Sequence, residues 1–261
     1  MNSLRWFLLS GLIACFASCV SSKKVAYFQD LSADSSAQSI ALTSPYTPTI
    51  KAGDILTVQV SSLNPEATTF FNPYTTLSTQ QSAATGTATP ASPIGYLVSA
   101  DGNIELPLLG KVVVNNLTTV QAADRIRDLL KKYLKEPTVN VRNSNFRISV
   151  IGEVSRPSMF TIPNEQITLL EALALAGDIP ISGRRDNVLL IREEGGQRKF
   201  IRLDLTGRDL FKSPYYYMHP NDVLYVEPSK VRIASNERFY QITPIILSAA
   251  SVLSIVLIRL L

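Results

Sequence analysis

The sequence is poor in the residue types that most catalytic and metal sites use. It has one histidine, His219, and two cysteines, Cys15 and Cys19, which both lie near the N-terminus. A histidine metal site or a catalytic triad needs partners at defined spacing, and none lies near His219 in the chain. Walker, GxGxxG and GxSxG motifs are also absent. We therefore expect no catalytic residues, no metal and no cofactor, and we interpret His219 as a loop histidine before a turn.

An excess of one charge is lacking as well. The 25 basic and 21 acidic residues give a net charge of +4, and no long run of Lys or Arg occurs. This balance argues against an electrostatic nucleic-acid binder. The pair Glu193-Glu194 precedes two glycines, which favours a solvated hairpin tip over a carboxylate pair for glycoside hydrolysis. The tyrosine run 215–217 could stack on sugar rings, but packing or an interface is the more common use of such a run.

What the sequence does contain is an apolar segment at each end. At the N-terminus, Arg5 precedes a short apolar stretch, and Ala17 and Ser18 lie directly before Cys19. The stretch is too short to span a bilayer and is typical of a secretory signal. The small-small-Cys ending resembles a bacterial lipobox, so we predict a lipoprotein signal peptide over residues 1–18 and lipidation of Cys19. Lipidation of Cys15, or an ordinary signal with incidental cysteines, are the alternatives.

The C-terminal segment, residues 244–261, predicts a membrane helix. Pro244 suits a first helical turn, and a helix from Ile245 to Leu261 would be about 25 Å long, close to the thickness of a thin outer membrane. At helical spacing several polar side chains share one arc, which predicts a stripe facing a pore or a neighbour. Its members are Ser248, Ser251, Ser254 and Arg259. The alternative is a plain single-span anchor whose serines bond their own backbone.

Between these ends the patterns predict an α+β fold of two consecutive small sheet-plus-helix domains. A polar tether over 19–45 comes first, then alternation over 55–61 predicts a strand. A Thr/Ser/Ala-rich flexible insert is expected over 72–93. Strands at 96–98 and 104–106 flank a hairpin turn at Asp101-Gly102, and a strand follows at 111–114. Thr118 and Gln121 form a capping box for a helix, and 138–141 is a strand. The expected apolar face of this helix contains Val120, Ala123, Ile126, Leu130 and Tyr133.

A second unit repeats this plan. Strands are expected at 146–152 and 159–162, and Thr168 and Glu171 form another capping box whose helix ends at Gly177. Strands at 187–192, 199–203 and 223–226 complete a small sheet. The resulting boundaries are 46–145 for the first domain, 146–230 for the second, 231–243 for a linker and 244–261 for the membrane helix.

Several of these motifs together resemble a known family. YTPTIKAGDILTVQVS, residues 46–61, and GYLVSADGNIELPLLGKVVVNNLTTVQAADRI, residues 95–126, resemble the export domain of Wza-like outer-membrane polysaccharide export lipoproteins. VIGEVSRPSMFTIPNEQITLLEALALAGDI, residues 150–179, resembles the SLBB β-grasp domain that follows it in that family, and 219–226 fits its last strand. The longest members carry an additional β-grasp domain, for which this chain has no room, so a shorter periplasmic part is expected.

The resemblance implies a function that composition alone does not. It implies a homo-oligomeric ring of eight subunits in the outer membrane, lipid-anchored at Cys19, with most of the chain in the periplasm. Each subunit would contribute one C-terminal helix to the pore, and polysaccharide fed by an inner-membrane co-polymerase would pass outward. On this basis we favour a stave of a shared helical barrel over a plain anchor for residues 244–261. The rival function is a membrane-anchored adaptor that binds sugar with its β-grasp domain.

Overall fold

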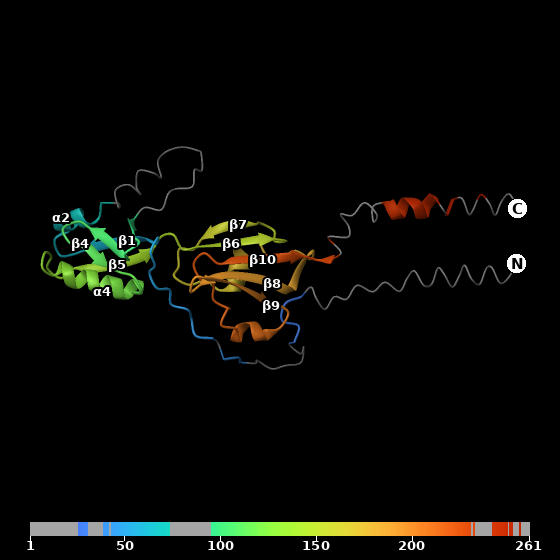
Figure 1. Ribbon diagram of the computed structural model, residues 1–261, viewed down its shortest axis with the longest axis horizontal. Helices are drawn as coiled ribbons and strands as arrows, with labels where there is room; N and C mark the ends of the chain where they lie inside the picture. The colour runs from blue at the N-terminus through green and yellow to red at the C-terminus, as the bar shows by residue number, and fades with distance from the viewer. Residues whose placement is uncertain are drawn as a thin grey trace.

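The chain folds around two hydrophobic cores, whose buried residues lie on either side of residue 145 in the sequence. The computed structural model describes residues 26–30, 39–41, 43–73, 95–230, 232, 242–249, 251–252 and 256. One core draws its buried residues from Ile50 to Val141 and the other from Phe146 to Val226. Figure 1 shows the corresponding sheets side by side along the long axis, with the helical residues 242–249 beyond the second. The expected α+β composition is confirmed.

The first domain contains a three-stranded antiparallel sheet in the order β2-β1-β5. Its strands are β1 (Ile55–Ser61), β2 (Tyr96–Leu97) and β5 (Thr138–Asn143), and β3 (Asn103–Leu106) with β4 (Gly110–Val113) forms a separate hairpin. Two short helices, α2 (Pro65–Thr68) and η2 (Thr69–Phe71), follow β1, and α4 (Thr119–Leu130) packs on β5. The strand predicted at 55–61 is confirmed, because its residues alternate between buried and exposed as a half-covered strand requires.

Two expectations for the first domain are wrong in detail. The Asp101-Gly102 turn exists, but β2 pairs with β1 while β3 pairs with β4, so the turn does not join two paired strands. Gly102 has a φ of +77° and packs against Asn115, where a Cβ would lie 2.3 Å from that side chain. The Gly102 carbonyl also accepts hydrogen bonds from the Val114 and Asn115 amides, so the turn packs against the segment that follows β4.

The buried face of α4 also differs from the predicted one. The capping box at Thr118 and Gln121 is present, and Ile126 and Leu130 are buried as expected. Val120 is instead 66% exposed and Tyr133 is 55% exposed and lies beyond the last helical residue. The buried set is Thr119, Ala122, Ile126 and Leu130. The predicted face is therefore correct at Ile126 and Leu130, and Ala123 packs against the core, whereas in the first turn Thr119 is buried in place of Val120.

Only residues 72 and 73 of the predicted insert 72–93 lie within the described part of the chain. Of these, Asn72 contacts β1. Its side-chain oxygen accepts a hydrogen bond from the Val60 amide at 2.8 Å, and its amide nitrogen donates to the Val60 carbonyl at 2.7 Å. The side chain thus mimics a strand partner for the end of β1. Asn72 therefore contacts the first domain, and the rest of the predicted insert stays a prediction.

The second domain is a five-stranded mixed sheet with one helix. Its order is β7-β6-β10-β8-β9, in which β6 and β10 are parallel and all other neighbours are antiparallel. The strands are β6 (Arg147–Gly152), β7 (Ser158–Thr161), β8 (Gly183–Glu194), β9 (Gln197–Leu203) and β10 (Val223–Pro228). Helix α5 (Leu169–Leu175) buries Leu169, Ala172 and Leu173 on the sheet, and η3 (Arg208–Lys212) follows β9.

Local signals in this domain are confirmed closely. Thr168 and Glu171 form the predicted capping box of α5, and Gly177, with a φ of +76°, follows its C-cap. The Glu193-Glu194 pair ends β8 at a tight turn through Gly195 and Gly196, which is the solvated hairpin tip expected for it.

Residues 242–249 are helical, as are the described residues 251, 252 and 256. No helix within the described residues has the length and apolar character needed to cross a bilayer. The membrane helix predicted for 244–261 extends over residues outside the described set, so it stays a prediction.

Candidate functional sites

The two domains meet through an aromatic stack. Tyr46, at the start of the first domain, stacks on His219, which precedes β10 of the second, with ring centroids 3.5 Å apart and planes 20° apart. On the other side, Thr119 at the start of α4 donates a hydrogen bond to Glu165 at 2.5 Å. His219 is thus a loop histidine, as expected, but it also forms part of the domain junction.

A buried ion pair contacts His219 at this junction. Arg192 on β8 and Asp222 are 3% and 1% exposed, and their closest nitrogen and oxygen are 2.6 Å apart. The Arg192 Nε also donates to Asp222, Nη2 donates to the Tyr217 carbonyl, and Nη1 lies 3.2 Å from His219 Nε2. Asp222 accepts the His219 backbone amide at 2.7 Å. Because each charge has several partners, the pair is compatible with burial.

This environment keeps the His219 imidazole neutral. Burial, together with the nearby Arg192 guanidinium, lowers the pKa of His219 to about 4. A neutral ring stacks on Tyr46 without placing a second cation beside Arg192. The cluster contacts both domains, through Tyr46 on one side and His219 on the other, and is suited to hold them together.

A groove of about 560 Å³, lined by both polar and apolar residues, runs along the same junction. It is bounded by the exposed side of α4, by the free edge of β5 and by residues 163–165 of the second domain. Amide, hydroxyl and charged groups line it, including Asn140, Asn164 and the Asp124–Arg127 ion pair. No aromatic residue is among its lining, so the stacking platform that sugar rings favour is not offered there.

Part of the segment expected to be a free tether contacts the second domain. The Tyr27 hydroxyl donates to Asp178, and the Arg185 guanidinium lies 4.8 Å from the centre of the Tyr27 ring. Burial and the hydrogen bond to Asp178 raise the pKa of Tyr27 to about 12. Asp30 forms an ion pair with Arg208 at 3.0 Å. Sequence reasoning missed this contact, although Tyr27-Phe28 is an aromatic pair within an otherwise Ser/Ala-rich stretch.

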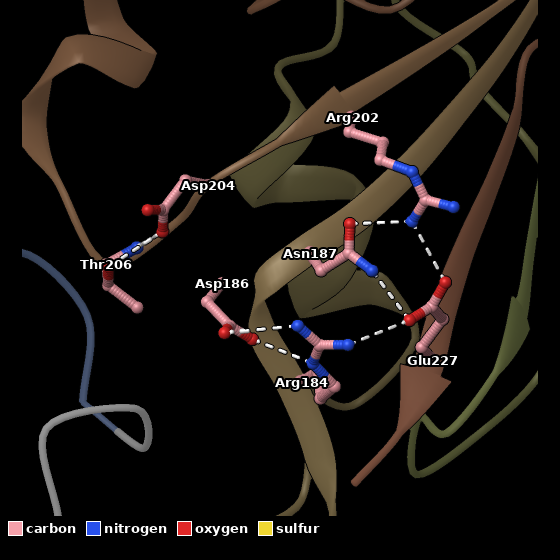
Figure 2. A network of polar contacts seen from close by, with 7 residues as sticks. All are labelled: Arg184, Asp186, Asn187, Arg202, Asp204, Thr206 and Glu227. Atoms are coloured by element: carbon pink, nitrogen blue, oxygen red, sulfur yellow. Dashed lines mark hydrogen bonds and ion pairs between the residues drawn. The ribbon is translucent and has the colours of Figure 1, made fainter.

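A polar network lies at one end of the five-stranded sheet (Figure 2). Arg184 contacts Asp186 at 3.0 Å and Glu227 at 3.1 Å, and Arg202 contacts Glu227 at 3.0 Å. Asn187 donates to Glu227 and accepts from Arg202. The hydrogen bond from Arg202 lowers the pKa of Glu227 most strongly. The two arginines are matched by two carboxylates, so the network is close to neutral.

The predicted pore-facing stripe is described only in part. The Ser248 hydroxyl donates to the Ile245 carbonyl and the Ser251 hydroxyl donates to the Ser248 carbonyl, each at 2.8 Å. These are bonds to the helix's own backbone, the pattern of the plain-anchor alternative. Ser254, Arg259 and the predicted lipidation residue Cys19 lie outside the described residues. Within the described ranges, no group of three or more His, Cys, Asp or Glu side chains could hold a metal ion.

Comparison with known proteins assigns the first of these domains. Residues 42–144, which contain the first core, match the family described as "Polysaccharide biosynthesis/export protein". Residues 42–144 thus form a domain of the polysaccharide biosynthesis/export protein family. This agrees with the resemblance drawn from the sequence motifs.

Two curated proteins are similar to this chain over more residues than the family match covers. The chain is 30% identical over 194 residues to the "EPS I polysaccharide export outer membrane protein EpsA" of Ralstonia solanacearum, and 34% identical over 163 residues to the protein of the same name from Ralstonia nicotianae. The alignments cover 73% and 61% of this chain but 50% and 41% of the relatives. The chain therefore spans half or less of their length. Both names describe export rather than a catalysed reaction.

Proposed function

We propose that the chain is a non-enzymatic subunit of an oligomeric outer-membrane channel that exports capsular or extracellular polysaccharide from the periplasm. The observation that carries this proposal is the export-family match over 42–144, together with the similarity to two relatives named as export outer-membrane proteins. The resemblance to Wza-like lipoproteins supplies the expected assembly: a ring of eight copies and an inner-membrane co-polymerase that feeds it.

The second domain fits the β-grasp role in this proposal. Its first and last strands, β6 and β10, are parallel neighbours inside the sheet. Helix α5, which follows the β6–β7 hairpin and precedes the β8–β9 hairpin in the chain, packs on one face. We assign residues 146–230 as the SLBB domain on this topology and on the motif resemblance at 150–179. The proposal further places the lipid on Cys19 and the membrane helix at 244–261, with Ser248, Ser251, Ser254 and Arg259 toward the pore or a neighbour.

One observation favours the adaptor as a second candidate. Ser248 and Ser251 satisfy their hydroxyls within their own helix, so neither needs water or a neighbouring helix as a partner. A sugar-binding lipoprotein with a plain C-terminal anchor would look the same at these positions. The choice between the two candidates therefore depends on assembly and on what the last helix does.

Assembly is tested on the full chain extracted from membranes with detergent. Particle images should show rings, and a strictly monomeric protein would contradict the channel. Deleting residues 244–261 should abolish export by a channel, whereas an adaptor held by Cys19 should keep it. Replacing 244–261 by a plain apolar helix of equal length is the matched control. It preserves an anchor but removes the polar stripe, so it should abolish export only if the helix forms part of a pore wall.

A further inference from the structure

The chain that precedes the first domain carries a short segment that docks on the second domain. This segment, residues 26–30, lies beside the five-stranded sheet and is drawn in blue in Figure 1; we call it the clip. Its Tyr27 and Phe28 are half-buried, and Tyr27 packs against the second core. They are the two aromatic residues of the predicted tether 19–45. The burial of this pair distinguishes the clip from the Ser/Ala-rich sequence around it.

The backbone of the clip is bonded to the chain that follows β9. The Gln29 amide donates to the Thr206 carbonyl at 2.7 Å, and the Phe28 amide donates to the Leu205 carbonyl at 3.5 Å. Fixing the backbone of a residue costs conformational entropy, which a tether that only spans a distance would keep. The clip is therefore a docked element rather than a stretch of free chain.

The side chains of the clip match the surface beneath them. The Phe28 ring stacks on Phe211 of η3, with centroids 5.2 Å apart and planes 30° apart. The Asp30 carboxylate accepts from the side chain of Arg208 at 3.0 Å and from its backbone amide at 3.1 Å. An aromatic and an acidic residue of the clip thus each find a complementary partner within one short helical turn of the second domain.

The Tyr27 ring covers a buried cation. Arg185 on β8 is 6% exposed and donates to the carbonyls of Ile179 and Pro180, while its Nε has no hydrogen-bond partner among the described residues. Burying a guanidinium among neutral acceptors is costly, and an aromatic face is an apolar surface that attracts a cation. The Tyr27 ring centre lies 4.8 Å from this guanidinium, and its hydroxyl donates to Asp178. The docking site therefore suits a tyrosine at this position.

Docking of the clip shortens the connection between Cys19 and the second domain. An extended chain spans at most about 3.6 Å per residue, so the stretch from Cys19 to Ala26 reaches no further than about 25 Å. Among the described residues, the next one bonded to the second domain is Thr43, whose amide donates to the Phe211 carbonyl at 3.3 Å. With the clip undocked, the stretch from Cys19 to Thr43 would reach about 85 Å.

The connection at the other end of the second domain is longer than the clipped one. The Ser229 amide donates to the Ser182 carbonyl at 2.7 Å, and the described C-terminal helical residues start at Ile242. The stretch between Ser229 and Ile242 reaches at most about 45 Å. If a membrane holds both ends of the chain, the clipped connection is therefore the one that limits how far the second domain can lie from it.

We propose that the clip fixes the N-terminal arm to the second domain and limits the distance between this domain and the lipid on Cys19 to about 25 Å. The distance limit rests on the lipid position in the proposed function, whereas the docking of the clip does not. Extra residues before the clip should raise the limit. Extra residues after the clip should not, because they lie between two points attached to the same domain.

The first test measures hydrogen exchange of the clip in the detergent-extracted full chain. The clip amides should be protected, and Tyr27→Ala should speed their exchange by at least about tenfold because it removes the ring from Arg185. Gln29→Ala is the matched control, since the Gln29 side chain donates to Ala26 within the clip, and it should keep the protection. Unprotected clip amides in the wild type would overturn this inference and leave the proposed channel standing.

The same measurement separates a clip from a part of the domain core. In Tyr27→Ala the strands β8 and β10 should keep their wild-type protection, because a clip opens without unfolding the domain that it docks on. Loss of protection across both strands would show that Tyr27 is a core residue of the second domain, and it would overturn the proposal.

The second test lengthens the arm on either side of the clip. About ten Gly/Ser residues inserted after Lys24 add up to about 35 Å before the clip, and the same insert after Ser35 adds them behind it. In liposomes, a fluorophore on Arg198→Cys reports the distance of the second domain from acceptor-labelled lipid head groups. Arg198 is exposed, and the sequence has no cysteine after Cys19. Energy transfer should fall for the first insert alone, and in the Tyr27→Ala background the two inserts should act alike.

The remaining outcomes count against the proposal. If both inserts changed energy transfer equally in the otherwise wild-type chain, or if neither changed it, the clip would not set the distance and the proposal would fail. Mass spectrometry of the same preparation identifies the modified residue. An unmodified Cys19 would overturn the distance limit together with the lipid position in the proposed function, even where the clip amides are protected.

Discussion

The two sheets of the molecule differ in what their uncovered sides carry. In the first domain β1 turns Thr57, Gln59 and Ser61 outward, so its open side is mostly polar, although Ile55 and its β2 partner Leu97, 63% exposed, lie at one end. In the second domain the outward positions of β8 and β10 are apolar, including Ile191 and Tyr225. On its uncovered side the second sheet is therefore the more apolar of the two.

The strongest way to test this contrast is to destabilise the second domain alone. Asp222→Asn leaves the Arg192 guanidinium, 3% exposed, without its charged partner. Removing one member of a buried pair costs about 3–5 kcal/mol, so hydrogen exchange should rise across β8 and β10 while α4 stays protected. Glu193→Gln is the control, because its ion pair with Arg198 is solvent-exposed and should contribute little. Equal loss of protection in both domains would show that they unfold as one unit.

The reciprocal experiment destabilises the first domain and checks the face of α4. Ile126→Ala removes a fully buried side chain and should cost about 2–4 kcal/mol, with exchange rising in β1, β5 and α4. Val120→Ala, on the same helix, should change stability by less than about 0.5 kcal/mol because Val120 is 66% exposed. A large effect at Val120 would restore the face predicted from hydrophobicity.

Local patterns predicted most of the elements. The alternation at 55–61, both capping boxes and Gly177 after α5 each depend on neighbours within a few residues, and each is found where expected. Pairing depends on distant residues and was predicted less well. The partner of β2 is β1, more than thirty residues earlier, and nothing in the Asp-Gly turn encodes that choice.

The candidate site was predictable to a smaller extent. The sequence predicts His219 as a loop residue. Its stack on Tyr46 is not predictable, because the two residues lie far apart in the chain. Tyr27 was assigned to a tether because its surroundings are polar, although its hydroxyl and ring contact Asp178 and Arg185. The apolar runs at 188–191 and 223–226 are visible in the sequence, but only the strand register shows which of their residues point away from α5.

The domain junction should respond to pH. The pKa of His219 is lowered from 6.5 to about 4 by burial and by Arg192, so the folded state binds fewer protons than the unfolded chain between these values. Stability from this group is therefore complete above about pH 7 and is lost as pH falls, by about 2 kcal/mol at pH 5. Urea unfolding at pH 8 and pH 5 measures this.

The control for the pH effect is His219→Gln, which cannot titrate. It should flatten the pH dependence between 5 and 8 while leaving the exposed carboxylates unchanged. If the same slope remained in His219→Gln, the sensitivity would belong to another group.

The smallest expected effect compares the two capping boxes. Thr118 and Thr168 both accept a hydrogen bond from the amide of the third helical residue, but the reciprocal partner is neutral Gln121 in α4 and the carboxylate of Glu171 in α5. Replacing either threonine by alanine should cost about 1 kcal/mol in its own domain.

Glu171→Gln converts the second box into the chemistry of the first. A carboxylate at a helix N-terminus also interacts with the helix dipole, which is worth about 0.3–1 kcal/mol and is screened by salt. Glu171→Gln should therefore cost about 0.5 kcal/mol at low salt and less in 1 M NaCl, whereas Gln121→Glu should stabilise α4 by a similar amount with the same salt dependence. Matched unfolding curves at two salt concentrations measure both. Because α5 has seven residues and α4 has twelve, a salt-dependent loss in α5 without a matching gain in α4 would show that the charge matters only for the shorter helix.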